Sequence, residues 1–148
     1  MTISVSEKIN APRERVWTLI TDPDSWAENI SGIKSVEVLE KPASGFVGLK
    51  WREKREFFGK EATETMWVTS AETGHWYETN ALNHGMAYTT RVSVAELGDG
   101  TTLTMTFDAK PTTLVARLMT PISMMFNGAV RKALQQDLGD IKAAAEKP

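Results

Sequence analysis

The stretch Thr101–Leu138, TTLTMTFDAKPTTLVARLMTPISMMFNGAVRKALQQDL, changes its hydrophobic period at Pro111. Before the proline, apolar and polar residues alternate, which is typical of a strand with one buried face, and we expect a strand at Thr101–Lys110. After the proline, apolar residues recur every three or four positions from Leu114 to Ile141, as on an amphipathic helix. The sequence therefore predicts a sheet followed by a C-terminal helix.

The helical part contains one internal proline. Pro121 cannot donate a backbone N–H and clashes with the turn before it, so we expect a kink or break there, with the main helix starting near Thr120-Pro121. A helix from Ile122 to Glu146 would be about 37 Å long at about 1.5 Å per residue, enough to cross a whole sheet. The segment Thr112–Ser123 is expected to act as a hinge beside any cavity under this helix.

Upstream of Thr101 the pattern is also dominated by strands. Alternation over residues 2–9 predicts a first strand, and two short helices are expected next, one after Pro12 and one at Ser25–Ile30. Short turns then separate five more expected strands, at Ile33–Lys41, Val47–Phe57, Glu61–Ser70, Trp76–Leu82 and Met86–Leu97. Because such short connections force neighbours to run antiparallel, the sheet is expected to be an antiparallel meander of seven strands.

Composition excludes several classes of protein. A length of 148 residues predicts a single domain, 1–148, and a net charge of -2 argues against nucleic acid as a partner. The absence of cysteine excludes disulfides, a thiolate nucleophile and zinc sites that depend on sulfur. No apolar run is long enough to cross a bilayer and the N-terminus has no leader pattern, so we expect a cytoplasmic protein without stable membrane insertion.

Several local motifs point to a known family. They are Ile9-Asn10-Ala11-Pro12 with Val16-Trp17, Thr21-Asp22-Pro23-Asp24-Ser25-Trp26, Gly98-Asp99-Gly100-Thr101, and the C-terminal Leu134, Leu138 and Ile141. On these residues the chain resembles, over nearly its whole length, the START-like (SRPBCC, birch-pollen-allergen-like) superfamily and its polyketide cyclase/dehydrase-like branch. The resemblance implies an α+β helix-grip fold, in which a curved antiparallel sheet wraps around the long helix and leaves an internal pocket. These motifs are turns, caps and core positions, so they are specific for fold and nearly silent on function.

Charged residues occupy one face of the expected third strand. Trp51, Glu53 and Arg55 alternate with a wholly charged opposite face, so we place them inward. Glu53 and Arg55 would then be polar anchors for an apolar ligand, while the alternative places them at the solvated rim of the sheet. Glu64, on the inner face of the next strand, is a candidate partner of Arg55 and a candidate acid or base.

Aromatic and methionine side chains could line one cavity between sheet and helix, although they could equally form an ordinary core. Tyr88 is the best neutral hydrogen-bond donor among them. Trp67 falls on the opposite face, which indicates either a homodimer contact or a bulge in its strand. The candidate ligand-binding residues are Trp51, Glu53, Arg55, Glu64, Met66, Trp76, Tyr88, Met105, Phe107, Met119 and Phe126.

The remaining motifs assign no cofactor. His75 and His84 lie near turns without a carboxylate in register, so we expect no metal site. No phosphate loop or nucleophile motif is present, and Gly98-Asp99-Gly100 is expected to be a hairpin turn rather than a dinucleotide fingerprint. We therefore expect neither a nucleotide nor another cofactor.

The sequence leads to one main hypothesis and two alternatives. The main one is binding of a small hydrophobic molecule, aromatic, polyketide-like or lipid-like, in a cavity where Glu53, Arg55, Glu64 and Tyr88 fix its orientation. The first alternative, motivated by the family resemblance, is a cyclase or dehydratase in which a cavity carboxylate or tyrosine moves protons. The second is a protein-interaction module, which predicts a cavity filled by side chains.

Overall fold

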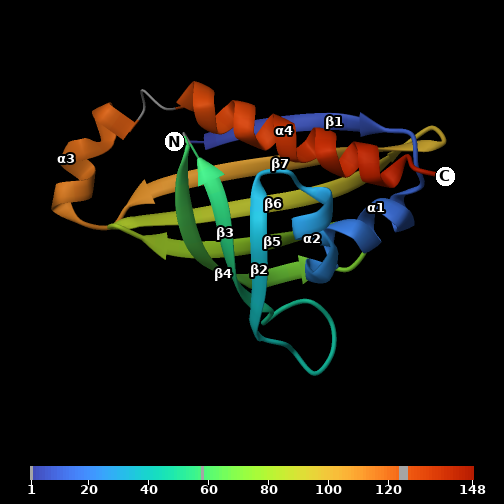
Figure 1. The fold of residues 1–148 in the computed structure, drawn as a ribbon, viewed down its shortest axis with the longest axis horizontal. Coiled ribbons are helices and arrows are strands. Elements are labelled where there is room, and N and C mark those ends of the chain that lie inside the picture. Colours follow the sequence, from blue (N-terminus) through green and yellow to red (C-terminus); the bar gives the residue numbers. More distant parts are fainter. Residues whose placement is uncertain (1, 58, 124–126) are drawn as a thin grey trace.

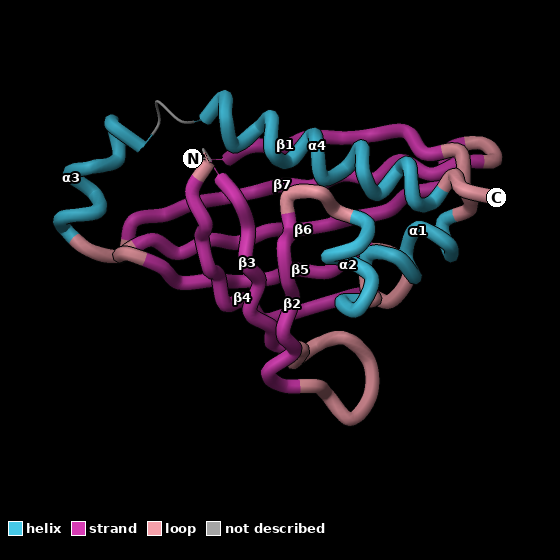
Figure 2. Tube along the Cα trace, viewed as in Figure 1, coloured by secondary structure: helices cyan, strands magenta, loops and turns pink. Residues whose placement is uncertain are grey.

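The computed structural model describes residues 2–57, 59–123 and 127–148, and it shows one bent sheet with helices on one side (Figure 1 and Figure 2). In these residues the sheet has seven antiparallel strands in the spatial order β1-β7-β6-β5-β4-β3-β2. The elements are β1 (Thr2–Ile9), α1 (Arg13–Ile20), α2 (Pro23–Asn29), β2 (Ile33–Glu40), β3 (Lys50–Phe57), β4 (Lys60–Glu72), β5 (Trp76–Asn83), β6 (Met86–Leu97), β7 (Gly100–Pro111), α3 (Leu114–Ser123) and α4 (Asn127–Ala145). This architecture confirms the predicted α+β helix-grip fold.

The sheet is a meander from β2 to β7, and β1 closes its far edge by pairing with β7. The two-residue turn Gly98-Asp99 joins β6 to β7 with Leu97 opposite Gly100, as the sequence predicts for a hairpin. Gly98 has φ of 59°, a left-handed conformation that glycine adopts without steric cost. In the view of Figure 1, β2, β3 and β4 run steeply across the direction of β1 and β7, so the sheet is strongly bent.

Strand β4 contains an irregularity in its pairing with β5. The pairing of β4 with β5 shifts register between Val68 and Ser70, directly after Trp67. Trp67 pairs with Lys50 and lies on the outer face, as alternation predicted. The bulge lies beyond Trp67 and does not change its face, so it is not the explanation for this tryptophan, and a homodimer contact there stays a prediction. Bulges of this kind increase local bending.

The packed core lies where α1 and α4 meet the sheet. Ile9, Val16, Leu103 and Leu138, from β1, α1, β7 and α4, are fully buried together. The end of α4 is held by α1, because Arg15 donates a 2.6 Å hydrogen bond from Nε to the carbonyl of Ala145. The C-terminal end of α4 is therefore packed against the sheet and bonded to α1.

Both expected short helices are present, but α2 begins at Pro23, two residues before the expected Ser25, and ends at Asn29. Asp22 caps α2 by accepting a hydrogen bond from the backbone of Asp24, and Pro23 occupies the first helical position. Trp26 is buried and donates from Nε1 to the carbonyl of Leu19 at 3.1 Å, which joins α2 to α1. These contacts place an aromatic ring under the concave face.

The C-terminal segment differs from the expectation that the main helix starts near Thr120-Pro121. α3 continues through Pro121 to Ser123, and α4 begins only at Asn127, so the main helix does not start at the proline. At about 1.5 Å per residue, the 19 residues of α4 span about 28 Å rather than 37 Å.

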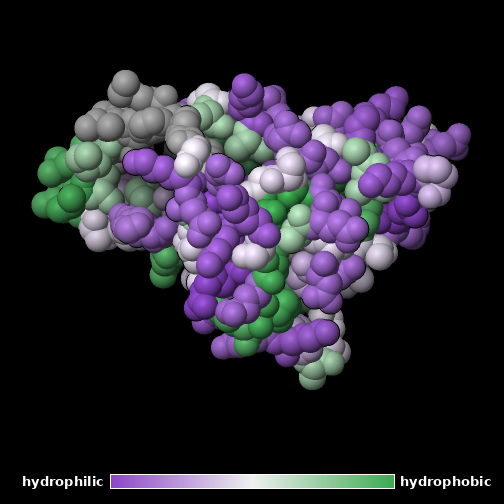
Figure 3. Space-filling view, in the orientation of Figure 1, coloured by the Kyte–Doolittle hydropathy of each residue, from purple (hydrophilic) through white to green (hydrophobic). Residues whose placement is uncertain are grey.

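The apolar stripe before Pro121 is not buried, contrary to the expectation of one continuous buried face. Leu114 and Val115 are each 72% exposed and Leu118 is 70% exposed. α3 projects from the end of the sheet, and Figure 3 shows a hydrophobic patch at that end of the molecule. Among the described residues, no helix combines the length and apolar character needed to cross a bilayer.

Candidate functional site

A cavity of about 660 Å³ lies between the concave face of the sheet, the inner side of α4 and the α1–α2 pair. Its walls are mostly apolar, with Met66, Val92, Met105 and Leu134 among the contributing side chains. This volume falls within the range of about 300–1,000 Å³ that is typical of small-molecule sites. The interior is therefore not filled by the aromatic and methionine side chains around it.

Most candidate residues named from the sequence border this cavity. Alternation along each strand brings them to the same concave face, since every second side chain of a strand points to one side. The candidates that line it are Trp51, Glu53, Arg55, Glu64, Met66, Tyr88, Met105 and Phe107.

Three candidates do not belong to this group. Trp76 lies on the outer face of β5, where the Arg91 guanidinium is 4.0 Å from its ring centroid and its Nε1 donates to Glu72. Met119 sits on α3 and borders a separate space of about 370 Å³ near the β5–β6 hairpin. Phe126 lies outside the described residues.

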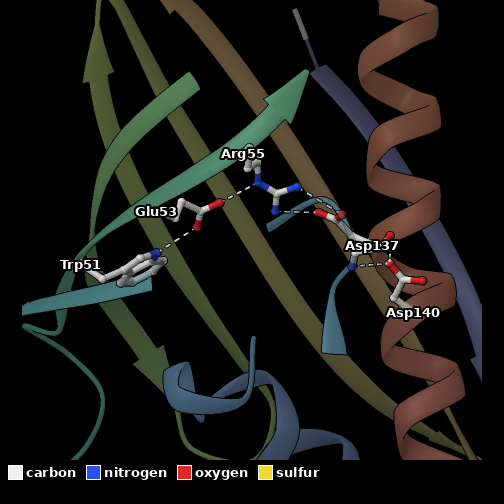
Figure 4. Close-up of polar contacts among 6 residues, drawn as sticks. Trp51, Glu53, Arg55, Asp137 and Asp140 are labelled. Carbon is white, nitrogen blue, oxygen red and sulfur yellow. Dashed lines mark hydrogen bonds and ion pairs between the residues drawn. The ribbon is translucent and has the colours of Figure 1, made fainter. Parts of the chain in front are cut away.

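A buried chain of polar contacts crosses the wall of the cavity (Figure 4). Glu53 is only 3% exposed, and both of its carboxylate oxygens are engaged. Trp51 donates from Nε1 to Oε1 at 2.9 Å, and Arg55 donates from Nε to Oε2 at 2.6 Å. Glu53 therefore lies inside the fold, and the part-buried Arg55 compensates its charge.

The chain continues from the sheet to α4. Arg55 donates from Nη1 and Nη2 to the two carboxylate oxygens of Asp137, at 3.2 and 2.8 Å. Such a fork-to-fork pair fixes geometry as well as charge, so it connects β3 to the helix that crosses the cavity. The neighbouring Asp140 accepts hydrogen bonds from the backbone and hydroxyl of Ser31 at 2.9 and 2.8 Å, which attaches α4 to the segment before β2.

Sequence reasoning missed Asp137 and assigned the wrong partner to Arg55. Glu64 does not contact Arg55; its strand position pairs with Glu53, and Arg55 stands opposite Ala62. The available signal was helical spacing, because Asp137 follows Leu134 by three residues and precedes Ile141 by four, which places a carboxylate on the buried stripe.

Burial and charge act against each other in this cluster. Burial by itself lowers the pKa of the Arg55 guanidinium, but the charges of Asp137 and Glu53 outweigh it and hold that pKa above its usual range. For Asp137, burial is the largest influence and raises the pKa of the carboxyl, although Arg55 opposes the shift. The guanidinium thus favours the ionised form of the buried acid, against the effect of burial.

Two further polar residues, Glu64 and Tyr88, face the cavity away from this chain of contacts. Asn83 donates from Nδ2 to Oε1 of Glu64 at 2.7 Å. Tyr88 stacks on Phe107 with ring centroids 5.5 Å apart, and among the described residues its hydroxyl makes no hydrogen bond. Burial, and secondarily the charge of Glu64, raises the pKa of the Tyr88 hydroxyl, so it is a protonated donor at neutral pH.

An aromatic group that sequence reasoning largely missed closes the other end. Trp26 meets Trp51 edge to face with centroids 5.0 Å apart, and Tyr77 packs in the same way on Phe46 at 4.8 Å. Tyr77 donates to the carbonyl of Ile20 at 3.1 Å, and burial raises the pKa of its hydroxyl. The available signal was strand alternation: Trp76 was assigned to the inner face of β5, but its neighbour Tyr77 is the residue that points inward.

The two histidines stay near turns, where the sequence placed them. His75 follows the turn after β4, and His84 lies in the β5–β6 turn with φ of 49°. Within the described ranges, no three histidine, aspartate, glutamate or cysteine residues gather as a metal site would require.

Solved structures of low sequence identity share this fold. A START superfamily protein from Mycobacterium smegmatis has a TM-score of 0.76 at 17% identity, and the match covers 98% of this chain and 97% of that chain. The Zhui aromatase/cyclase from Streptomyces sp. R1128 has a TM-score of 0.78 at 16% identity, covering 99% and 93%. The protein Ara h 8.0201 has a TM-score of 0.74 at 12% identity, covering 98% and 97%.

These likenesses establish the START-like fold, and a separate comparison addresses the family. No curated protein matches the sequence. A family model described as polyketide cyclase / dehydrase and lipid transport matches residues 1–146, nearly the whole chain, and the chain therefore belongs to this family.

Proposed function

We propose that this protein binds a small hydrophobic molecule in the cavity between the sheet and α4. The observation that carries the proposal is the open volume of about 660 Å³ with mostly apolar walls. Burial of apolar ligand surface would supply most of the affinity, at about 25 cal/mol per Å². An interaction module was expected to have a filled interior, so the open cavity favours ligand binding over that alternative.

The charged groups of the cavity and Tyr88 divide into two roles. Glu53 and Arg55 bond to each other and to Trp51 and Asp137, so they hold the wall in shape. Glu64 and Tyr88 retain hydrogen-bonding capacity toward the cavity, and in this proposal they orient the ligand. Trp51, Met66, Met105 and Phe107 supply apolar contact in the proposed site.

A cavity-filling variant tests the proposal. Ala81 is 6% exposed and lines the cavity, so Ala81→Trp places an indole in the space that the ligand would use. The probe is N-phenyl-1-naphthylamine, an uncharged fluorophore whose emission rises in apolar surroundings. We expect the wild type to bind it and Ala81→Trp to weaken binding at least about tenfold, or about 1.4 kcal/mol.

The matched control keeps the substitution and changes the face. Ala95 is exposed on the outer side of β6, so Ala95→Trp adds the same side chain outside the cavity. This variant should bind the probe as the wild type does. Binding that is absent in the wild type, or equally strong in Ala81→Trp, would contradict the proposal.

A cyclase or dehydratase activity is the second candidate, supported by Tyr88 and Glu64 facing one apolar cavity in a chain of this family. A protonated tyrosine and a carboxylate could give and take protons on a bound carbon chain. Native mass spectrometry of the purified protein can identify a co-purifying molecule. An enzyme would convert an excess of that molecule, with loss of water for a dehydratase, and Glu64→Gln would stop the conversion; a carrier would leave the molecule unchanged.

A further inference from the structure

The charged side chains that line the cavity do not balance. Among the described residues they are Glu53, Glu64, Asp137 and Arg55, three carboxylates against one guanidinium. All four come from the inner faces of β3, β4 and α4. An incoming ligand therefore meets a surplus of negative charge inside a largely apolar enclosure, where charges interact more strongly than in water.

Arg55 does not offset this surplus for a ligand. Its Nε donates to Glu53, and its Nη1 and Nη2 each donate to Asp137. Both carboxylates are nearly inaccessible to solvent, and the three guanidinium nitrogens of Arg55 all bond to them. Although an arginine in a ligand cavity often receives a carboxylate or phosphate, this one is already occupied by two acids.

Glu64 is the carboxylate outside the Arg55 cluster and Tyr88 the phenol hydroxyl that a ligand meets, beside the neutral polar side chains of the lining, Asn29, Thr79, Asn80 and Thr90. One oxygen of Glu64 accepts from Asn83, and no further hydrogen bond of its carboxylate to a described residue is present. The Tyr88 hydroxyl likewise has no bond to a described residue. Both residues line the cavity, and Glu64 is near enough for its charge to contribute to the raised pKa of Tyr88. The pair thus offers one acceptor and one donor toward the same space.

We propose, building on the proposed ligand binding, that the cavity selects hydrophobic molecules whose polar end is an uncharged hydroxyl and disfavours those that end in a carboxylate. A hydroxyl carries one hydrogen to donate and lone pairs to accept, which matches Glu64 and Tyr88 together. A carboxylate can only accept, so it would repel Glu64 and add a further buried negative charge without a cation to pair with it.

Two ligands with the same alkyl chain test this selection. 1-Dodecanol and dodecanoate are each titrated against the complex of the wild type with N-phenyl-1-naphthylamine, at about pH 7.5, where the acid is ionised. We expect the alcohol to displace the probe at least about tenfold more strongly than the acid, a difference of about 1.4 kcal/mol. Equal or stronger displacement by dodecanoate would overturn the inference.

Two conservative variants assign the selection to the residues. Glu64→Gln removes the charge and retains the shape of the side chain. Dodecanoate should therefore gain affinity, and the difference in affinity between 1-dodecanol and dodecanoate should narrow several-fold. Tyr88→Phe retains the stacking on Phe107 and removes the donor, so binding of 1-dodecanol should weaken several-fold. An unchanged gap in Glu64→Gln would refute the role of Glu64.

The design separates this inference from the proposed function. Failure of the wild type to bind the uncharged probe would refute ligand binding itself. Normal binding of the probe, with displacement by dodecanoate matching that by the alcohol, would leave ligand binding intact and refute only the selection against acids.

Discussion

The buried cluster of Glu53, Arg55 and Asp137 predicts an asymmetry between removing its cation and removing an acid. Arg55→Met leaves two carboxylates that are 3% and 4% exposed, with no positive charge beside them. Removing one partner of a buried pair costs about 3–5 kcal/mol, because the remaining charge is desolvated without compensation. Asp137→Asn leaves the Arg55–Glu53 pair intact, so we expect it to cost less than Arg55→Met.

The stability of Arg55→Met should depend on pH through the ionisation of Asp137. In the wild type, burial raises the pKa of Asp137 above its usual value of 3.8 while Arg55 opposes that shift. Without the guanidinium the pKa rises further, so the variant is most stable where Asp137 is protonated and loses stability as pH rises through the folded-state pKa. Its deficit relative to the wild type should therefore be smaller at about pH 5 than at about pH 8.

Urea unfolding followed by tryptophan fluorescence measures these differences. For a chain of this length, about 3–5 kcal/mol corresponds to a fall in Tm of about 6–20 °C. If Arg55→Met does not fold, the double variant Arg55→Met/Asp137→Leu should regain part of the lost stability, because it removes one of the two buried carboxylates left without a cation; Glu53 remains. A cost for Arg55→Met below about 1 kcal/mol, or one smaller than that of Asp137→Asn, would refute the reasoning.

Two further predictions concern ionisation and the placement of α3. The chain has two tyrosines, and the pKa values of both, Tyr77 and Tyr88, lie above the ordinary 10.0. At pH 10.0 the native protein should therefore show less tyrosinate absorbance than the protein unfolded in urea, and its stability should fall as pH rises beyond that value. Equal absorbance of the two states would contradict this. Gly85 and Gly74 both have positive φ, but a Cβ at Gly85 would lie 2.7 Å from Oγ1 of Thr113 whereas one at Gly74 meets nothing within 4 Å. Gly85→Ala should therefore lower stability more than Gly74→Ala and increase proteolysis near α3, and equal effects in urea unfolding would argue against this contact.

The fold was largely predictable because its signals are local. Alternation located the seven strands, and the cluster Asp22-Pro23-Asp24 located α2 to within two residues of its start, since these signals depend only on neighbouring residues. The division between α3 and α4 was misplaced because Pro121 is the stronger breaker in isolation, yet helix α3 continues through it. The exposure of Leu118 was equally beyond reach, because an apolar stripe does not reveal whether a sheet extends beneath it.

The site was predictable only in part. Strand alternation brings Trp51, Glu53 and Tyr88 to one face, and the structure places them around the cavity. Partners across long sequence separations were not accessible, and Asp137 is 82 residues from Arg55. Whether the interior stays open also depends on how side chains from several elements pack, which no local pattern describes.

The most direct test of the central claim is a crystal structure of the protein grown with N-phenyl-1-naphthylamine. The account predicts electron density for the probe enclosed by α4 and the concave face, in contact with Met66 and Phe107. An interior closed by interlocked side chains, with the probe absent or held only on the outside of the sheet, would contradict it.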